Sequence, residues 1–178
     1  MAETYTLQVA GFTRELPICK INDDLSIAAF IMFGDVELTV ACAEELIKKA
    51  PPFDVIVTAE AKAIPLAYEM SRQSGKKYIP ARKDVKLYMQ EPVVVEVESI
   101  TTAKVQSLCI DRPELDYLNG KRILIVDDVI STGGSLQAME AIVAKSTGTV
   151  VARAAVLAEG EAAQRGDILF LAPLPLLT

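Results

Sequence analysis

Fold and function depend most on residues 122–135, which read Arg122-Ile123-Leu124-Ile125-Val126-Asp127-Asp128-Val129-Ile130-Ser131-Thr132-Gly133-Gly134-Ser135. Their branched apolar run predicts a buried strand that ends in two adjacent carboxylates. A turn rich in hydroxyl groups and glycine follows and leads into a helix. Carboxylates accept hydrogen bonds from sugar hydroxyls, and backbone N–H groups at a helix N-terminus bind phosphate. The stretch therefore predicts a site for a sugar phosphate.

Three other interpretations share parts of this pattern. A Walker-type phosphate loop is excluded, because no Gly-Lys-Ser/Thr follows Gly133 and Gly134. A receiver domain also has a strand ending in Asp-Asp, but it needs acids at an earlier strand end and a late lysine, which the later predicted strands do not offer. An ordinary strand-to-helix turn stays open for the glycine-rich segment taken alone. The unbroken order of carboxylates, hydroxyls and glycines favours a sugar-phosphate site over these other interpretations.

The composition predicts a globular chain with a sizeable core. Its 178 residues are 51% hydrophobic and 24% charged, with a formal net charge of −6. An acidic chain disfavours nucleic-acid or anionic-membrane binding, which needs clustered cations. One local cluster of cations stands out within residues 72–86: Arg72, Lys76, Lys77, Arg82, Lys83 and Lys86. This cluster indicates a binding region for a small polyanion, and the alternative is a solvated basic helix end and loop.

The chain contains no histidine, which excludes Ser-His-Asp hydrolases, Cys-His proteases and most zinc enzymes. Any general base must be Asp, Glu, Lys or the substrate itself. Cys19, Cys42 and Cys109 lie in apolar contexts without metal-ligand spacing, which predicts reduced thiols in a cytoplasmic protein. Residues 1–5 do not resemble a signal peptide, and the uncharged residues 168–178 are too short to span a bilayer. We expect no membrane association.

Strands and helices alternate along most of the chain, which predicts an α/β fold with a mostly parallel sheet covered on both faces. Residues 93–97 and 104–110 are expected to pair as an antiparallel ribbon. In such sheets ligands bind beyond the carboxyl ends of strands, where strand order reverses. We expect strands at 5–9, 54–58, 77–81, 93–97, 104–110, 122–126, 149–157 and 168–171, an extended run from 11 toward 21, and helices at 36–50, 61–73 and 135–145.

A second loop meets the same rule at the end of the strand 54–58. It reads Thr58-Ala59-Glu60-Ala61-Lys62-Ala63, with small residues that let a ligand approach the backbone and a lysine near a helix start. An ordinary strand-to-helix turn is the alternative. If the sheet is parallel, this loop and residues 131–135 lie at one edge.

Residues 123–135 fill every position of the phosphoribosyl pyrophosphate (PRPP) signature of the type I phosphoribosyltransferases. From about residue 53 to 157 the chain resembles the adenine phosphoribosyltransferase branch of this family. Glu60-Ala61-Lys62 is similar to the family's pyrophosphate loop. Residues 81–87, which contain Arg82, Lys83 and Lys86, resemble the start of its mobile loop.

The resemblance implies one phosphoribosyltransferase domain over 1–178, with a small N-terminal hood at about 1–35 and a PRPP-binding core at 53–157. It implies transfer of ribose 5-phosphate from PRPP to a purine base, giving a nucleoside monophosphate and pyrophosphate, by a homodimer with Mg²⁺. The metal would be held mainly by substrate, with Asp127 or Asp128 acting through water. The implied site residues fall into three groups: Asp127 and Asp128 at the ribose; Ser131, Thr132, Gly133, Gly134 and Ser135 at the 5′-phosphate; and Glu60, Ala61, Lys62, Arg82, Lys83 and Lys86 at the pyrophosphate.

The base stays open. Hypoxanthine-guanine enzymes of the family usually place an acid where this chain has Ser131, which favours adenine. Adenine enzymes, however, have a glutamate in the mobile loop near the position of Thr102, and here only Glu96 or Glu98 is close. Xanthine, guanine and hypoxanthine are therefore alternatives, as is a non-catalytic paralogue that senses PRPP or a nucleotide. Residues 86–106 are the candidate lid, and no base-binding residue is assigned.

Overall fold

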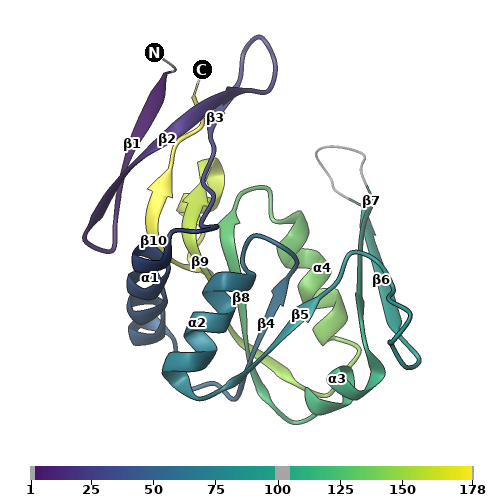
Figure 1. Ribbon diagram of the computed structural model, residues 1–178. Helices are drawn as coiled ribbons and strands as arrows, with labels where there is room; N and C mark the ends of the chain where they lie inside the picture. The colour runs from purple at the N-terminus through teal and green to yellow at the C-terminus, as the bar shows by residue number, and fades with distance from the viewer. Residues whose placement is uncertain (1–2, 99–104, 178) are drawn as a thin grey trace.

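A computed structural model describes residues 3–98 and 105–177. Its elements alternate between strand and helix through the middle of the chain (Figure 1). The strands are β1 (Thr4–Val9), β2 (Phe12–Lys20), β3 (Ser26–Ala28), β4 (Val55–Ala59), β5 (Lys77–Ala81), β6 (Val93–Glu98), β7 (Val105–Ile110), β8 (Arg122–Ile130), β9 (Thr149–Glu159) and β10 (Leu169–Leu174). The helices are α1 (Val36–Lys49), α2 (Ile64–Ser74), α3 (Arg112–Tyr117), α4 (Gly134–Val143) and the 3-10 helix η1 (Gly160–Gln164).

The central sheet is parallel and has the strand order β10-β9-β8-β4-β5. From β4 the chain moves to one side, through α2 to β5. From β8 it moves to the other side, through α4 to β9 and β10. The strand order therefore reverses between β4 and β8, which is where ligands bind in open α/β sheets. At that point the buried Thr58 Oγ1 donates a hydrogen bond of 2.8 Å to the carbonyl of Val126 and joins the two strand ends.

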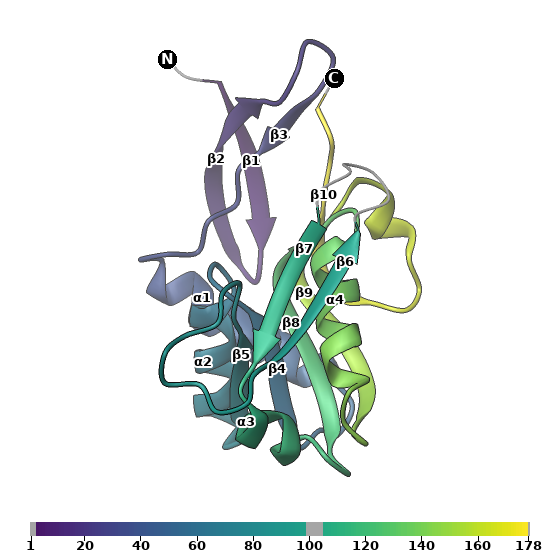
Figure 2. The same cartoon turned by 90° about the vertical axis from the view of Figure 1, so that its right-hand side faces the viewer.

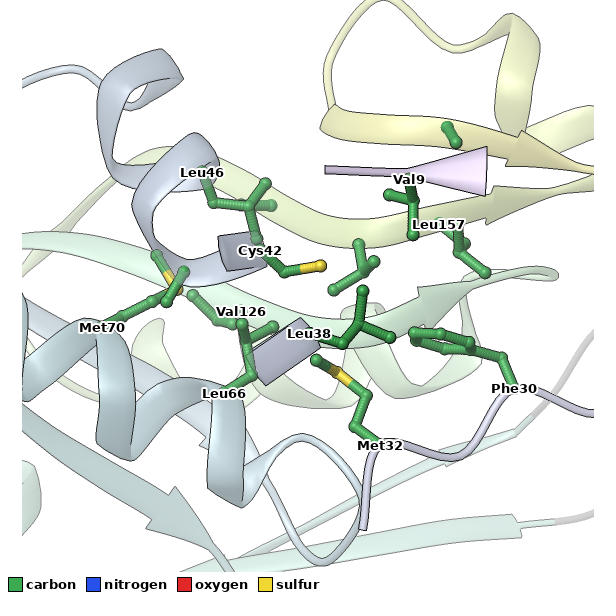
Figure 3. Close-up of a cluster of buried hydrophobic side chains, with 14 of the residues drawn as sticks. Val9, Phe30, Met32, Leu38, Cys42, Leu46, Leu66, Met70, Val126 and Leu157 are labelled. Carbon is green, nitrogen blue, oxygen red and sulfur yellow. The ribbon is translucent and has the colours of Figure 1, made fainter. Parts of the chain in front are cut away.

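Alternate residues of the central strands face two hydrophobic cores, because successive side chains of a strand point to opposite faces. On β8, Leu124 and Val126 belong to the core beneath α1 and α2. Ile123 and Ile125 belong to the core beneath α4 and the β6–β7 ribbon. Figure 3 shows the first core, where Leu38 of α1 and Leu66 of α2 lie beside Val126. Both faces of the sheet are covered, as predicted.

The three strands β1, β2 and β3 form a small antiparallel sheet that stands beyond the carboxyl ends of the central strands (Figures 1 and 2). The end of the chain joins this hood, because Ser26 and Leu177 exchange two backbone hydrogen bonds of 2.7 and 3.0 Å. Arg14 of β2 pairs with Asp35 at 2.7 Å, and Asp35 caps the first turn of α1 as predicted. The hood is thus fastened to the helix that begins the core.

Several boundaries differ from the predictions. Strand β8 does not end at the carboxylates: it continues to Ile130, because the long β9 pairs with Val129 and Ile130 through Leu157 and Ala158. Helix α2 begins at Ile64 and not at residue 61, with proline in its first turn, where the fixed φ of proline suits a helix start. The predictions also missed β3, α3 and η1, which are short and held by tertiary contacts.

The β5 strand matches its predicted range residue for residue, and β6 and β7 pair antiparallel as expected. Helix α4 begins one residue earlier than predicted, at Gly134. None of the helices in residues 3–98 and 105–177 combines the length and hydrophobicity that crossing a bilayer requires.

Candidate active site

A cavity of about 640 Å³ opens at the switch point between β4 and β8. It brings together segments that are far apart in sequence: the loop after β4, the end of β8, the start of α4 and one edge of β7. Its lining consists of Ala59, Glu60, Ala61, Lys62, Lys83, Val105, Gln106, Ser107, Leu108, Asp127, Asp128, Val129 and Ser135. The two predicted loops therefore do meet at one edge of the sheet.

The two carboxylates at this edge have different surroundings. Asp127 Oδ1 accepts the backbone N–H of Asp128 at 2.9 Å. The Asp128 side chain is only 5% exposed and lies 3.1 Å from Lys62 Nζ, measured to Oδ2. This contact is an ion pair without hydrogen-bond geometry, so Oδ2 has no hydrogen-bond donor among the described residues. A buried carboxylate oxygen without a donor can accept a hydrogen bond from a ligand hydroxyl.

Burial raises the pKa of Asp127 well above the usual range of aspartic acid, and the negative charge of Asp128 raises it further. Lys62 opposes this shift by its positive charge. Two adjacent carboxylates in a cavity favour a cation or a hydroxyl-bearing ligand that reduces their mutual repulsion. The site therefore lacks a group that would offset the repulsion between the carboxylates of Asp127 and Asp128.

The glycine-rich loop after β8 surrounds a second hollow of about 90 Å³, which Asp127 also lines. All five predicted phosphate residues lie around it: Ser131, Thr132, Gly133, Gly134 and Ser135. Gly133 has φ +85°, a left-handed conformation that glycine adopts without strain, and it immediately precedes the first turn of α4. The first N–H groups of an α-helix have no partner within the helix, and the helix dipole is positive at this end. The start of α4 can therefore stabilise an anion beside the loop.

Gln106 of β7 is a cavity residue that the sequence did not indicate. Its Oε1 accepts a hydrogen bond of 3.3 Å from Ser135 Oγ, and its side chain lies against Gly134. It reaches the loop because the β6–β7 ribbon packs over α4. The alternation of apolar and polar residues over 104–110 predicted the strand, but it did not predict which surface the strand contacts.

The predicted pyrophosphate residues divide into two groups. Glu60, Ala61, Lys62 and Lys83 line the cavity, whereas Arg82 and Lys86 lie outside its lining. Arg82 donates from Nε to Glu60 Oε2 at 2.7 Å and from Nη1 to the hydroxyl of Tyr88 at 2.6 Å. Lys86 Nζ lies 3.9 Å from a carboxylate oxygen of Asp84. The basic cluster is therefore not uniformly directed at the cavity, because part of it is engaged in internal ion pairs.

The prediction that Glu60 contacts pyrophosphate concerns a side chain that already has partners in the protein. Its carboxylate has the same charge sign as pyrophosphate, and both oxygens already accept hydrogen bonds from the segment after β5. The side chain of Glu60 is thus not available to a pyrophosphate group. The prediction for Thr102 lies outside the described residues, as does the part of the candidate lid from 99 to 104.

A match to a protein-family model decides the family. Residues 41–169 match the phosphoribosyl transferase domain. The chain belongs to the phosphoribosyltransferase family. The matched range includes both loops of the cavity and the segment between them, and it extends beyond the core range of 53–157 that the sequence indicated.

Among curated relatives, the adenine phosphoribosyltransferase of Thermotoga petrophila is 35% identical over 102 residues, which are 57% of this chain and 57% of the relative. That of Chlorobaculum parvum is 36% identical over 98 residues, 55% of this chain and 52% of the relative. This phosphoribosyltransferase chain thus spans a little over half the length of these relatives.

Solved structures extend the similarity over more of the chain. The adenine phosphoribosyltransferase of Thermoanaerobacter pseudethanolicus has a TM-score of 0.66 at 28% identity, covering 78% of this chain and 82% of that one. That of Rhodothermus marinus has a TM-score of 0.65 at 20% identity and covers 95% and 92%. The predicted type I phosphoribosyltransferase fold is confirmed, and with it the resemblance to the adenine branch.

Magnesium was expected at this site of the phosphoribosyltransferase. No group of three or more His, Cys, Asp or Glu side chains suited to a metal occurs in residues 3–98 and 105–177. The available donors are the two carboxylates of Asp127 and Asp128. Mg²⁺ is commonly bound by one or two carboxylates together with substrate phosphates and water, so this donor set fits a metal that arrives with the substrate.

Proposed function

We propose that this chain is a purine phosphoribosyltransferase that transfers ribose 5-phosphate from PRPP to a nucleobase, with adenine as the preferred base. The observation that supports this most is that three groups line two cavities which share Asp127 and Ser135. These groups are the loop 131–135, the carboxylates of Asp127 and Asp128, and the lysines Lys62 and Lys83. PRPP has a phosphate, a diol and a pyrophosphate in the same succession.

The proposed placement of PRPP follows the chemistry of these groups. The 5′-phosphate lies in the loop formed by Ser131, Thr132, Gly133, Gly134 and Ser135, and its charge is stabilised by N–H groups at the start of α4. The ribose 2′ and 3′ hydroxyls donate hydrogen bonds to Asp127 and Asp128. The pyrophosphate contacts the backbone at Ala61 and the ammonium groups of Lys62 and Lys83, with Lys86 reaching it if the loop at 82–89 shifts.

In the proposed reaction a nitrogen of the base attacks the anomeric carbon while the bond from that carbon to the pyrophosphate oxygen breaks. The bonding electrons leave with pyrophosphate, and the base gives up its ring N–H proton to water or to the released pyrophosphate. Positive charge develops on the ribose ring and negative charge on the leaving group. The carboxylates of Asp127 and Asp128 stabilise the first, and Lys62 and Lys83 stabilise the second. The chain thereby supplies charges of both signs where the transition state needs them.

Magnesium, when bound with the substrate, neutralises pyrophosphate charge and makes it a better leaving group. A divalent cation near the pair would offset the repulsion from Asp128 that contributes to the raised pKa of Asp127. We propose contact to Asp127 or Asp128 through water, because the protein offers two carboxylates and no complete ligand cage among its described residues.

Adenine is supported by the names of the relatives and by Ser131, which replaces an acid typical of hypoxanthine-guanine enzymes. The decisive experiment mixes the purified chain with PRPP and Mg²⁺ and supplies adenine, guanine, hypoxanthine or xanthine separately. Pyrophosphate release with adenine is expected. Release only with another base would replace adenine, and PRPP binding without release with any base would identify a sensor in place of an enzyme. Repeating the assay with excess chelator is expected to abolish release.

We further propose a cytoplasmic homodimer. Cys19, Cys42 and Cys109 are free thiols, as expected in a reducing compartment such as the cytoplasm.

The proposed dimer has a candidate contact surface. Val36 and Tyr68 are 71% and 57% exposed beside an apolar groove of about 400 Å³ between α1 and α2, which is a surface suited to self-association. Light scattering coupled to size-exclusion chromatography measures the mass in solution, and a monomer would contradict this part of the proposal.

A further inference from the structure

We propose that Glu60 is a positioning residue that fixes the basic segment after β5 and thereby places Lys83 in the pyrophosphate region. This inference rests on the proposed function. It assigns Glu60 the role of holding Arg82 and Lys83 in place, since Glu60 itself does not contact the substrate. It also explains why a negative charge lies in the wall of a cavity suited to a polyanion.

Glu60 joins the two loops that follow adjacent parallel strands. Its backbone N–H donates to the carbonyl of Ala81 at 2.9 Å. Its Oε1 accepts the backbone N–H of Lys83 at 2.6 Å, and its Oε2 accepts Arg82 Nε at 2.7 Å. The side chain is 18% exposed. Three short contacts from one residue therefore define where the chain runs as it leaves β5.

Arg82 is held from further directions. Its backbone exchanges hydrogen bonds of 2.8 and 2.7 Å with Cys109 of β7, and its Nη1 donates to Tyr88. An arginine fixed in this way neutralises Glu60 and has little freedom to follow a ligand. The pKa of Glu60 is accordingly lowered, first by the Lys83 N–H and then by Arg82. The pair removes the repulsion that an unpaired carboxylate would exert on pyrophosphate.

The contacts of Glu60 restrain the backbone of Lys83. Its main-chain N–H donates to Glu60, and Lys83 lines the same cavity as Lys62. Its ammonium group has no ion-pair partner in the described part of the chain. Holding the backbone of a residue limits the volume that its side chain can sample. Such preorganisation strengthens binding because less conformational freedom is lost when the ligand arrives.

The chain contains a matched control at the other end of β4. Asp54, directly before β4, accepts the backbone N–H of Arg122 at 2.8 Å and its Nε at 3.0 Å. This pair has the same parts as the Glu60 pair, a carboxylate that accepts one backbone N–H and one arginine, and it lies at the edge of the sheet remote from the cavity. Asp54→Asn thus removes an equivalent charge without touching the site.

The experiment compares Glu60→Gln with Asp54→Asn in the full chain. Calorimetry measures the binding of pyrophosphate with Mg²⁺, and separately of ribose 5-phosphate, and kinetics measure KM for PRPP and kcat. We expect Glu60→Gln to weaken pyrophosphate binding about tenfold, the effect of losing a charge-assisted hydrogen bond. Ribose 5-phosphate binding is expected to stay within about twofold, and Asp54→Asn to change neither ligand by more than about twofold.

Two results would overturn the inference. Equal losses for pyrophosphate and ribose 5-phosphate would show a general structural role, and unchanged or tighter pyrophosphate binding would show that Glu60 only restrains Arg82. A double-mutant cycle with Lys83→Gln adds an independent check, because positioning through Lys83 requires the double variant to be little worse than Lys83→Gln alone. Should Glu60→Gln fail to fold, Glu60→Asp retains the charge but shortens the reach, and an intermediate loss is expected.

The failure of the proposed function is distinguishable from the failure of this inference. If the unsubstituted chain binds neither pyrophosphate nor ribose 5-phosphate, the phosphoribosyltransferase proposal itself is wrong. If it binds both and Glu60→Gln behaves like Asp54→Asn, only the positioning role is wrong.

Discussion

Acidic residues at the two edges of the central sheet have opposite pKa shifts and different partners. At the amino edge, Arg122 makes two side-chain contacts and one backbone contact with Asp54 and holds the pKa of that carboxyl well below its usual range. At the carboxyl edge, burial and a second carboxylate raise the pKa of Asp127, and Asp128 keeps an oxygen without a hydrogen-bond donor in the described chain. Asp54 is thus a fully paired structural carboxylate, whereas the Asp127–Asp128 pair at the opposite edge still needs a ligand.

Asp128→Asn is the strongest test of this contrast. Removing the charge that we propose to face the ribose is expected to lower turnover at least about tenfold, a typical effect of losing a group that stabilises transition-state charge. Steady-state pyrophosphate release measures it. The matched change at the amino edge, Asp54→Asn, is expected to leave turnover nearly unchanged. Similar turnover in the two variants would remove the functional distinction between the edges.

Gly133→Ala tests the phosphate loop. Alanine at φ +85° is strained by about 1 kcal/mol, and its Cβ would also lie 3.2 Å from Arg165 Nη1. We expect KM for PRPP to rise about fivefold. Gly75→Ala is the control, because Gly75 has φ +70° at the end of α2 with open space around it. Both variants are expected to lose thermal stability, and only the first to lose affinity for PRPP.

Asp127→Asn tests the raised pKa through the pH dependence of stability. A carboxyl group whose pKa is raised in the folded state binds more protons there than in the unfolded state. Stability therefore falls as pH rises from the unfolded pKa through the folded pKa. The asparagine variant lacks this loss, so its Tm is expected to exceed that of the parent near pH 7 and to approach it near pH 4, while its activity falls.

A Tm difference between Asp127→Asn and the parent that stays constant from pH 4 to 8 would show that Asp127 titrates normally. Because Asp127 and Asp128 interact, the difference between the two curves reports the titration of the pair and not of Asp127 alone.

Gln106→Ala is expected to have the smallest effect. It removes a neutral hydrogen bond to Ser135, worth about 1 kcal/mol, and should raise KM for PRPP no more than about fivefold with little change in kcat. Gln73, which donates to the carbonyl of Val40 away from the cavity, provides the control. A change in PRPP affinity with Gln73→Ala equal to that with Gln106→Ala would show that β7 has no specific role at the loop.

Much of the site could be predicted because its parts are contiguous. The carboxylates and the phosphate loop lie within nine residues, and their chemistry depends on residue type and on a strand followed by a helix. The second loop could be placed at the same edge because parallel strands bring their carboxyl ends together. These inferences need only local patterns and the direction of the strands.

The predictions failed where partners are distant in sequence. Strand β8 was expected to end where the two carboxylates begin, after residue 126, but pairing with β9 extends it to Ile130. Glu60 and Arg82 were both assigned to pyrophosphate, yet they pair with each other across 22 residues. Charge alone indicates that a cation is present, and only the fold determines whether that cation faces a ligand or a carboxylate.

The amino-acid sequence by itself determined the α/β fold, the glycine-rich loop at 131–135 and the acidic pair, because each follows from residue type and short-range spacing. The tertiary structure decided the rest. It made Lys62 the partner of Asp128, fixed Arg82 on Glu60, left Lys83 in the cavity and brought Gln106 to the phosphate loop. The physical reason is that an ion pair or a hydrogen bond depends on distances of about 3 Å between side chains, and these are set only when separate strands and helices pack.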